Sequence, residues 1–515
     1  MPFLVTTSKN SYTSSLNRSQ IPRVENLFNN KNIALALEEN AHRRKNHPAI
    51  IEGSKTISYQ ELDPIVRRIA GHLSDQGIEQ GSIIGICLPD NADHLMILYA
   101  VARIGAVILP LDWRWTEQEK TRVVDFFKVS LVVGLPDAEL PRFNYAAVDD
   151  AWHQSVANRA PDSICTDGGE NPVVLSLSSG TTGRPKGPML THAQFTARFV
   201  MQWVTLGFSQ HDRYLSATPI YFGGGRSFTM GCLFSGSTVI LFPPPYEPDD
   251  LVAAVVKYEV TTLLLVPTLL RRLLALPRGN RPLLASLNRL LSTGAILHPD
   301  ERAAVMSNLN PNFINYYGST EGGGTSVLLP RHTGVSSTSV GEPIYQTEIQ
   351  IVDEKDQELP VGEPGLIRYR STGISDNFYN DPEASLEAFQ DGWFYPGDIG
   401  QIDREGLLYL VGRTKDVIIR AGVNIYPAEI EQVLLNHPAI TDAVAVAWPN
   451  PERGEDVAVF VVMNEVVDGE ILLDYCRENI AAYKVPLGIF FIEEMPKTTL
   501  GKIIKADLVA RLPTQ

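Results

Sequence analysis

The stretch VVLSLSSGTTGRPKG, residues 173–187, joins an apolar run to a loop of serine, threonine and glycine that ends in a lysine. Glycine lets the backbone approach an anion closely, and hydroxyls supply hydrogen-bond donors. The loop lacks the spacing of a nucleotide-hydrolase P-loop, because Gly187 and Pro188 follow Lys186 where a serine or threonine would hold magnesium. A flexible surface linker is the alternative. The buried-looking run before the loop and the helix-like run 191–204 after it favour a phosphate-binding loop.

Helix-like and strand-like runs alternate on both sides of this loop. Residues 60–77 and 93–105 are typical of helices, whereas residues 83–89 and 106–111 are typical of buried strands, and the same alternation returns in the middle of the chain. Apolar strands that alternate with helices indicate mainly parallel sheets covered by helices on both faces. We therefore predict an α/β protein with a large N-terminal domain, residues 31–412, that contains two such sheets.

The pattern changes twice toward the C-terminus. Residues 340–411 contain short strands and turns, which predict a small β layer. After residue 416 a new alternation of strands and helices begins, which predicts a small α+β C-terminal domain, residues 417–515. Residues 1–30 are interpreted as a polar tail. The first 24 residues contain no Asp or Glu and many Ser and Thr, so an organelle-targeting segment is the alternative.

The composition is that of a globular protein with an acidic balance. A chain of 515 residues with 44% hydrophobic content can form more than one domain. Its formal net charge of -15 argues against nucleic acid or an anionic membrane as the main partner. The most apolar segment, 261–276, is interrupted by Pro267, Arg271 and Arg272, so no membrane-spanning helix is expected. The 4 cysteines have no metal-ligand spacing, which indicates reduced thiols, no structural zinc and a cytoplasmic location.

Five separated segments share their order and spacing with one superfamily of enzymes. They are SSGTTGRPKG (178–187), INYYGSTEGG (314–323), WFYPGDI (393–399), YLVGRTKDVIIRAGVNIYPAEIE (409–431) and PKTTLGKI (496–503). Together they resemble the adenylate-forming superfamily of acyl-CoA synthetases, peptide-synthetase adenylation domains and insect luciferases, and the resemblance covers nearly the whole chain. The run NIYPAEIE is most similar to acyl-CoA synthetases. The resemblance implies that a carboxylate and ATP give acyl-AMP and pyrophosphate, and that coenzyme A then takes the acyl group and releases AMP.

The resemblance also implies where ATP binds. Glu321 is similar to the magnesium ligand, an oxygen donor suited to a hard cation, and Thr320 to the donor that contacts the α-phosphate. Around the adenine, the implied residues are Tyr317, Gly318, Gly294 and Ala295. The implied phosphate-binding residues are Ser178, Ser179, Gly180, Thr181, Thr182, Gly183 and Lys186.

Three further residues complete the implied chemistry of the first step. Asp398 resembles the carboxylate that accepts both ribose hydroxyls, and Arg413 resembles the cation near the same sugar. The chain departs from the common pattern at Pro396, where a serine or threonine is usual. Lys502 resembles the lysine that compensates the charge developing at the α-phosphate.

The resemblance implies motion between the two half-reactions. In this superfamily the small domain rotates between an adenylating pose and a thioester-forming pose. The hinge would be residues 413–416, with Lys415 as the hinge residue, and residues 417–515 would be the mobile domain. Gly422 would line the pantetheine tunnel, where a side chain would obstruct the thiol.

Residues 217–231 are similar to the region that borders the acyl tunnel. The implied acyl-pocket residues are Phe222, Gly223, Gly224 and Arg226. Phe222 stands in the place of an aromatic or histidine gate. Arg226 has two interpretations: it pairs with a second carboxylate or polar tail on the substrate, or it faces solvent from a helix start. We expect a small to medium aliphatic or aromatic monocarboxylic acid as the substrate.

The expected co-substrates are ATP and coenzyme A, with Mg²⁺ as the cofactor. One alternative is a stand-alone adenylation enzyme that loads the pantetheine thiol of a carrier protein. A second is a non-catalytic nucleotide-binding sensor. The intact Glu321, Asp398, Arg413 and Lys502 argue against the sensor, because binding alone does not need charge compensation for chemistry.

Overall fold

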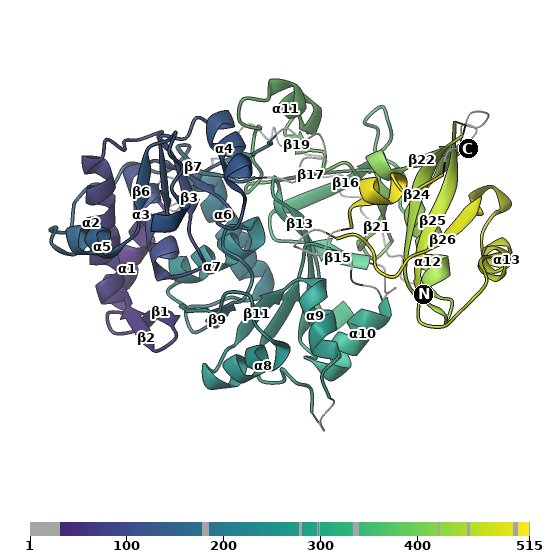
Figure 1. Ribbon diagram of the computed structural model, residues 1–515, viewed down its shortest axis with the longest axis horizontal. Helices are drawn as coiled ribbons and strands as arrows, with labels where there is room; N and C mark the ends of the chain where they lie inside the picture. The colour runs from purple at the N-terminus through teal and green to yellow at the C-terminus, as the bar shows by residue number, and fades with distance from the viewer. Residues whose placement is uncertain are drawn as a thin grey trace, which may run out of the picture.

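The computed structural model describes residues 31–177, 185–277, 281–295, 297, 299–332, 339–420, 423–450, 454–497 and 503–513. Strands and helices alternate from residue 35 to about residue 319, as the sequence predicts (Figure 1). The α/β class is therefore confirmed. Within the described residues, no helix is long and apolar enough to cross a membrane.

The first sheet is built from residues 83–191. Its pairs are parallel except for the last, in which β7 and β8 run antiparallel on either side of the glycine-rich loop. In spatial order its strands are β6 (Tyr145–Ala147), β5 (Leu131–Gly134), β3 (Ile83–Cys87), β4 (Val107–Pro110), β7 (Pro172–Leu175) and β8 (Met189–Thr191).

The second sheet contains a parallel section from β1 to β13, edged by the antiparallel strand β2. The carboxyl ends of parallel strands meet at one edge of a sheet, which is where ligands bind in open α/β sheets. Its strands, in spatial order, are β2 (Lys55–Ser58), β1 (Pro48–Glu52), β10 (Thr238–Leu241), β9 (Arg213–Ser216), β11 (Thr262–Leu265), β12 (Arg289–Ser292) and β13 (Phe313–Ser319).

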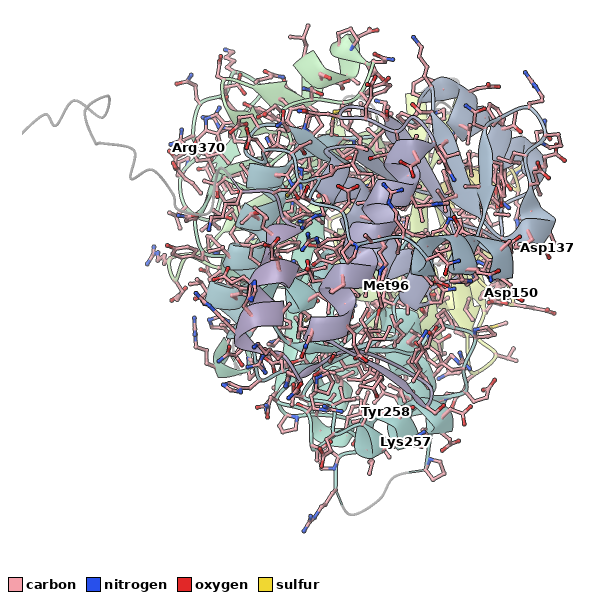
Figure 2. All side chains as sticks on the ribbon, turned by 90° about the vertical axis from the view of Figure 1, so that its left-hand side faces the viewer. Met96, Asp137, Asp150, Lys257, Tyr258 and Arg370 are labelled. Carbon is pink, nitrogen blue, oxygen red and sulfur yellow. The ribbon has the colours of Figure 1, made fainter. Side chains whose placement is uncertain are left out.

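Helices fill the space between the two sheets and cover their outer faces. The largest buried cluster joins β3 and β4 to β9 and β10 through α2 (Tyr59–Asp75), α3 (Ala92–Ile104), α6 (His192–Leu206) and α7 (Gly223–Ser235). The outer faces carry α4 (Glu117–Phe126) on the first sheet and α8 (Pro248–Lys257), α9 (Pro267–Leu274) and α10 (Pro299–Asn308) on the second. Helices α1 (Leu35–Arg43) and α5 (Asp150–Ala157) pack on α2. In Figure 2, Asp137 and Asp150, which lie near the first sheet, are labelled at the right, whereas Lys257 and Tyr258, at the end of α8 on the second sheet, are labelled near the bottom.

The predicted β layer is present and continues the second sheet. Strand β14 pairs with β13 and β15, and β15 pairs with β21, so one hydrogen-bonded path runs from the parallel section into the layer. The layer contains β14 (Gly323–Leu328), β15 (Ser339–Pro343), β21 (Leu408–Arg413), β20 (Asp398–Ile402), β17 (Gly365–Ser371), β16 (Thr347–Val352), β19 (Trp393–Phe394) and β18 (Phe389–Gln390), with α11 (Pro382–Ala388) beside it.

The C-terminal part forms a sheet of its own, at the right of Figure 1. Two buried clusters, one on each face, pack α12 and α13 on one side and α14 on the other. Its elements are β22 (Ile418–Arg420), β23 (Val423–Ile425), α12 (Pro427–Leu435), β24 (Ile440–Asn450), β25 (Gly454–Met463), α13 (Gly469–Asn479), β26 (Gly488–Phe491) and α14 (Lys505–Val509).

Candidate active site

The candidate catalytic turn joins β13 to β14 at the carboxyl edge of the second sheet. It carries Thr320 and Glu321, which are both half-buried. The Ser319 hydroxyl accepts the Gly322 N–H at 2.9 Å and contacts the Tyr369 hydroxyl at 3.1 Å, so the turn is fastened to the β layer behind it. Gly318 has no room for a side chain, because a Cβ there would lie 2.2 Å from the Gly323 carbonyl oxygen.

A buried arginine on α6 holds the backbone of this turn. The Arg198 guanidinium donates to the carbonyl oxygens of Thr320 at 3.1 Å, Glu321 at 2.6 Å and Gly373 at 2.7 Å. Burial lowers the pKa of Arg198 to about 10, so the side chain remains cationic at neutral pH. Sequence reasoning missed Arg198. The available signal was that Arg198 is the one Lys, Arg, Asp or Glu in the helix-like run 191–204.

The position of Arg198 along helix α6 is fixed because nearby residues define where the helix begins and where it ends. The Thr191 side chain accepts the Gln194 N–H while the Gln194 side chain accepts the Thr191 N–H, a reciprocal arrangement that fixes the first turn. Gly207 ends the helix with φ 69°, a conformation that glycine adopts readily.

The predicted ribose-binding residues lie together. Asp398 begins β20 and stands opposite Arg413 at the end of β21, and Arg413 Nε lies 2.9 Å from Asp398 Oδ1. The Tyr317 hydroxyl donates to Asp398 Oδ2. Burial and the neighbouring Asp398 charge raise the pKa of Tyr317 well above its usual range, so the phenol keeps its proton. Tyr317, Asp398 and Arg413 thus form one corner joined by a hydrogen bond and an ion pair.

A threonine from the predicted hinge lies next to this corner. Its backbone N–H and its hydroxyl both donate to the Gly397 carbonyl, at 2.9 and 3.1 Å. Pro396 lacks the usual hydroxyl, and Thr414 brings a hydroxyl to Gly397, the next residue along the chain. Thr414 was included in the predicted hinge but was given no role of its own. Lys415 follows in the short helix η4 (Thr414–Asp416), where desolvation and then the Arg413 charge lower its pKa.

The small-residue segment follows β12 at the same sheet edge. Gly294 has φ 95°, which requires glycine, and a Cβ at this position would lie 3.9 Å from Val266. Because Ser292 pairs in register with Asn315, the segment at Gly294 and Ala295 leaves the sheet beside the strand that carries Tyr317. The predicted adenine residues therefore lie on, or just after, two neighbouring strands.

The predicted acyl segment borders the catalytic turn. A Cβ built on Gly223 would lie 4.0 Å from Thr320 Oγ1, and one built on Gly224 would lie 3.5 Å from Phe222 and 3.9 Å from Leu264, so a Cβ fits at both positions with ordinary contacts. Gly225 differs, because a Cβ there would lie 2.2 Å from the Pro219 carbonyl oxygen.

Arg226 does not face solvent. The side chain is 2% exposed, and its guanidinium donates to the Ser176 hydroxyl and to the carbonyls of Ile220 and Tyr221. The solvent-facing interpretation is therefore wrong: the first turn of α7 directs Arg226 into the interior, toward β7.

The remaining predicted residues are only partly described. Lys186 lies with Nζ 5.6 Å from the centre of the Phe378 ring, and the Gly187 carbonyl accepts the Tyr379 N–H at 2.8 Å. The other phosphate-loop residues, Lys502, Gly422 and the tail 1–30 lie outside the described residues.

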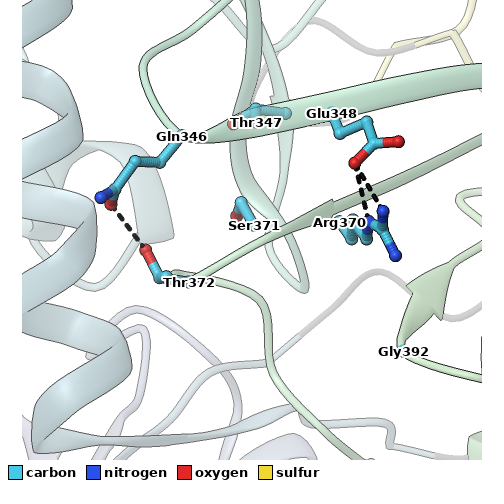
Figure 3. A pocket seen from close by; sticks show the side chains of 7 residues that line it. All are labelled: Gln346, Thr347, Glu348, Arg370, Ser371, Thr372 and Gly392. Carbon is cyan, nitrogen blue, oxygen red and sulfur yellow. Dashed lines mark hydrogen bonds and ion pairs between the residues drawn. The ribbon is translucent and has the colours of Figure 1, made fainter. Parts of the chain in front are cut away.

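A separate hollow lies on the outer face of the β layer, with a volume of about 520 Å³ (Figure 3). Arg370 and Glu348 pair across it at 2.7 Å, and Thr372 donates to Gln346 at 3.2 Å. None of the predicted nucleotide or acyl residues lines it.

The donor set suits a magnesium ion held jointly with a nucleotide. No group of three or more His, Cys, Asp or Glu side chains able to hold a metal occurs among the described residues. Magnesium is commonly held by one or two carboxylates together with phosphate oxygens, and Glu321 fits that requirement.

Comparison with known proteins agrees with this geometry. Residues 37–379 match the AMP-binding enzyme family and residues 429–502 match the AMP-binding enzyme C-terminal domain. The chain is 31% identical to a feruloyl-CoA synthase of Amycolatopsis, covering 90% of this chain and 95% of the relative. It is also 31% identical to an indoleacetate–CoA ligase of Aromatoleum aromaticum, covering 89% and 94%. ATP-bound MatB from Rhodopseudomonas palustris superposes with a TM-score of 0.86 at 25% identity, covering 93% and 98%.

The chain therefore belongs to the AMP-binding enzyme family. Within that family it is an AMP-forming acid–CoA ligase, which uses ATP to convert a carboxylic acid to an acyl-adenylate and then to an acyl-CoA. The resemblance found in the five sequence segments is confirmed.

Proposed function

We propose that this ligase activates an aromatic monocarboxylic acid, whose ring lies along Gly223 and Gly224 and whose carboxylate faces Thr320. The observation that carries the proposal is that both positions lack a side chain but have room for a Cβ at ordinary contact distances, with Gly223 next to the Thr320 hydroxyl. Relatives named for ferulate, indoleacetate and 2-succinylbenzoate support an aromatic substrate. The Arg226 side chain is only 2% exposed and is not presented to the substrate, which favours a substrate without a second carboxylate.

We assign the nucleotide contacts as follows. Asp398 accepts the ribose hydroxyls, and Tyr317 and Arg413 hold its carboxylate in place. Thr320 donates to the α-phosphate, and Glu321 and the triphosphate together hold Mg²⁺, which neutralises charge on the pyrophosphate leaving group. A bound magnesium ion in the MenE complex with ATP supports this cofactor. The loop 178–187, including Lys186, binds the outer phosphates.

We further propose roles for the residues of the C-terminal domain in the two half-reactions and for the hinge that connects the domains. Lys502 compensates charge on the α-phosphate in the first step, and Gly422 lines the passage by which the coenzyme A thiol reaches the adenylate. Residues 413–416 are the hinge between the large domain 31–412 and the small domain 417–515, with Lys415 as the pivot. The separate core of the C-terminal sheet supports movement of this part as one body.

The test is to incubate the purified protein with ATP, Mg²⁺ and coenzyme A and with ferulate, indole-3-acetate, benzoate, hexanoate, acetate or malonate singly. Mass spectrometry then follows AMP, acyl-adenylate and acyl-CoA. We expect AMP and acyl-CoA from at least one aromatic acid, and neither product with the Asp398→Ala control.

Two outcomes would contradict specific parts of the proposal. Turnover of acetate or malonate alone would overturn the aromatic substrate class. Acyl-adenylate that accumulates without acyl-CoA would instead indicate a carrier-protein thiol as the acceptor.

A further inference from the structure

Arg226 is a buried cation whose charge is not neutralised by the described part of the chain. Its partners there are a hydroxyl and two backbone carbonyls, and its Nε has no hydrogen-bond partner. Burial lowers its pKa to about 9, so it stays protonated at neutral pH. A buried guanidinium without a carboxylate is unfavourable unless nearby groups or a ligand stabilise it.

One side of Arg226 faces the neck of the glycine-rich loop. The Ser176 hydroxyl accepts from Arg226, and the Ser176 N–H donates to the Pro188 carbonyl at 3.2 Å. Ser176 and Pro188 flank the segment 178–187 on its two sides, and Ser176 is 3% exposed. Arg226 therefore binds the residue that closes the base of this loop.

The other side of Arg226 faces the turn that leads to Phe222. Its Nη1 donates to the carbonyls of Ile220 at 3.4 Å and Tyr221 at 3.1 Å. The Ile220 N–H donates to the buried Asp90 carboxyl at 3.1 Å, so both an N–H and the carbonyls of this turn are bonded to buried side chains. Gly225 permits the close approach, because a Cβ there would meet the Pro219 carbonyl.

We propose that Arg226 is a positioning residue that links the neck of the phosphate loop to the turn carrying Phe222, so that ATP binding orders the acyl side of the site. The triphosphate supplies the negative charge that the described residues do not give to Arg226. Attraction to it strengthens the bonds that Arg226 makes to Ser176 on one side and to Ile220 and Tyr221 on the other. The two substrates are then coupled through one side chain.

The test uses MgATP as the probe and follows amide hydrogen exchange by mass spectrometry. In the wild type, saturating MgATP should slow exchange both in residues 173–190 and in residues 214–224. In Ser176→Ala the loop segment should remain protected, but the ATP-dependent protection of residues 214–224 should fall by about tenfold, as expected for losing a hydrogen bond to a charged group.

Ser216→Ala is the matched control. Ser216 is equally buried and contacts Thr229 of the same helix α7 at 3.0 Å, one turn beyond Arg226. Among the described residues, the hydrogen bond of its hydroxyl is to Thr229 and not to the loop neck, so its response to ATP should match the wild type at a similar melting temperature. Arg226→Met should behave as Ser176→Ala does, and Arg226→Lys should restore part of the protection because its ammonium still donates.

Three results would overturn the proposal. Ser176→Ala could keep full protection of residues 214–224, or the wild type could show protection of the loop segment alone. A wild type without protection in either segment would contradict ATP binding itself, and therefore the ligase function as well.

Discussion

At the residue scale, the hydrogen bond from Tyr317 to Asp398 joins the adenine and ribose sides of the nucleotide site. Tyr317→Phe keeps the ring but removes the donor that orients the carboxylate. We expect the KM for ATP to rise roughly 3- to 10-fold, because a hydrogen bond to a charged group contributes on the order of 1 kcal/mol or more. Pyrophosphate–ATP exchange measures this. Tyr246→Phe, which removes a buried hydroxyl bonded to the Ala217 carbonyl at 2.9 Å, should leave KM unchanged.

Alanine substitutions at the two neighbouring glycines Gly224 and Gly225 should have different effects on stability. Gly225→Ala should lower the free energy of unfolding by roughly 1–3 kcal/mol, because its Cβ would overlap the Pro219 carbonyl. Gly224→Ala should fold normally, since its Cβ would make ordinary contacts. Gly224→Leu should lower kcat/KM for aromatic acids at least about tenfold relative to acetate, by filling the space proposed for the ring. Equal melting temperatures for the two alanine variants would refute the packing argument.

Asp90 predicts a pH dependence of stability. Burial raises its pKa to about 7 in the folded protein, whereas an unfolded Asp titrates near 3.9. Between these values the folded state binds the extra proton, so this contribution to stability is fully present below about pH 4 and is lost progressively as the pH rises to about 7.

Asp90→Asn should therefore be more stable than the wild type at pH 8, and this difference should be smaller at pH 5. Thermal unfolding at the two pH values measures this, with a difference of roughly 2–4 °C at pH 8. The exposed Asp137→Asn serves as the control and should show no such difference. A wild type that gains stability relative to Asp90→Asn on going to pH 8 would reverse the sign and exclude Asp90 as the cause.

The residues that sequence reasoning identified are those whose chemistry sits in a short motif. Tyr317, Asp398 and Arg413 were found in this way, and the structure brings them together. Arg198 and Thr414 were missed because their role depends on partners far along the chain or across a strand pair. The burial of Arg226 was also unforeseen, because spacing alone does not say which side of a helix start meets the core.

At the element scale, helix α14 is tied to the predicted hinge by one lysine. Lys505 Nζ lies 3.5 Å from Asp416, 3.6 Å from Glu431 and 3.3 Å from the Ala445 carbonyl oxygen. It follows Lys502 by three residues, so it anchors the segment that carries the proposed first-step lysine to η4 and α12.

Lys505→Met should slow acyl-adenylate formation about tenfold while sparing thioester formation from supplied acyl-adenylate, because only the first step needs Lys502 in place. Single-turnover assays of each half-reaction measure this. Lys497→Met is the control: Lys497 pairs with Asp442 at 3.1 Å, on the other side of Lys502, and does not contact η4 among the described residues. Equal loss of both half-reactions in Lys505→Met would exclude a positioning role.

Most elements were predictable because their periodicity is local. The strand at 83–89 and the helix at 60–77 appear with small shifts, as β3 and α2. The pairing of β15 with β21 was not predictable, since it joins residues about seventy positions apart and depends on the register Ser339 with Tyr409. The sequence therefore predicted a small β layer within the large domain but not that this layer extends the second sheet.

At the scale of the whole molecule, the two half-reactions make separate demands on the C-terminal part. Lys502→Ala should abolish acyl-adenylate formation and retain thioester formation from supplied acyl-adenylate. Replacement of Gly422 by tryptophan should do the reverse, since a large side chain would block the thiol. The same single-turnover assays distinguish these outcomes. If each variant lost both steps equally, the proposed roles of Lys502 and Gly422 would fail.

The three carbonyls that Arg198 holds also bear on how the enzyme acquires activity. Its partners lie 122, 123 and 175 residues away along the chain. Contacts of such long sequence separation form after local helices and hairpins, because closing a long loop carries an entropic penalty. During synthesis, residues 320–321 and 373 emerge from the ribosome long after α6. We therefore expect the catalytic turn to form late in folding, so that ATP turnover should begin only after the turn is in place.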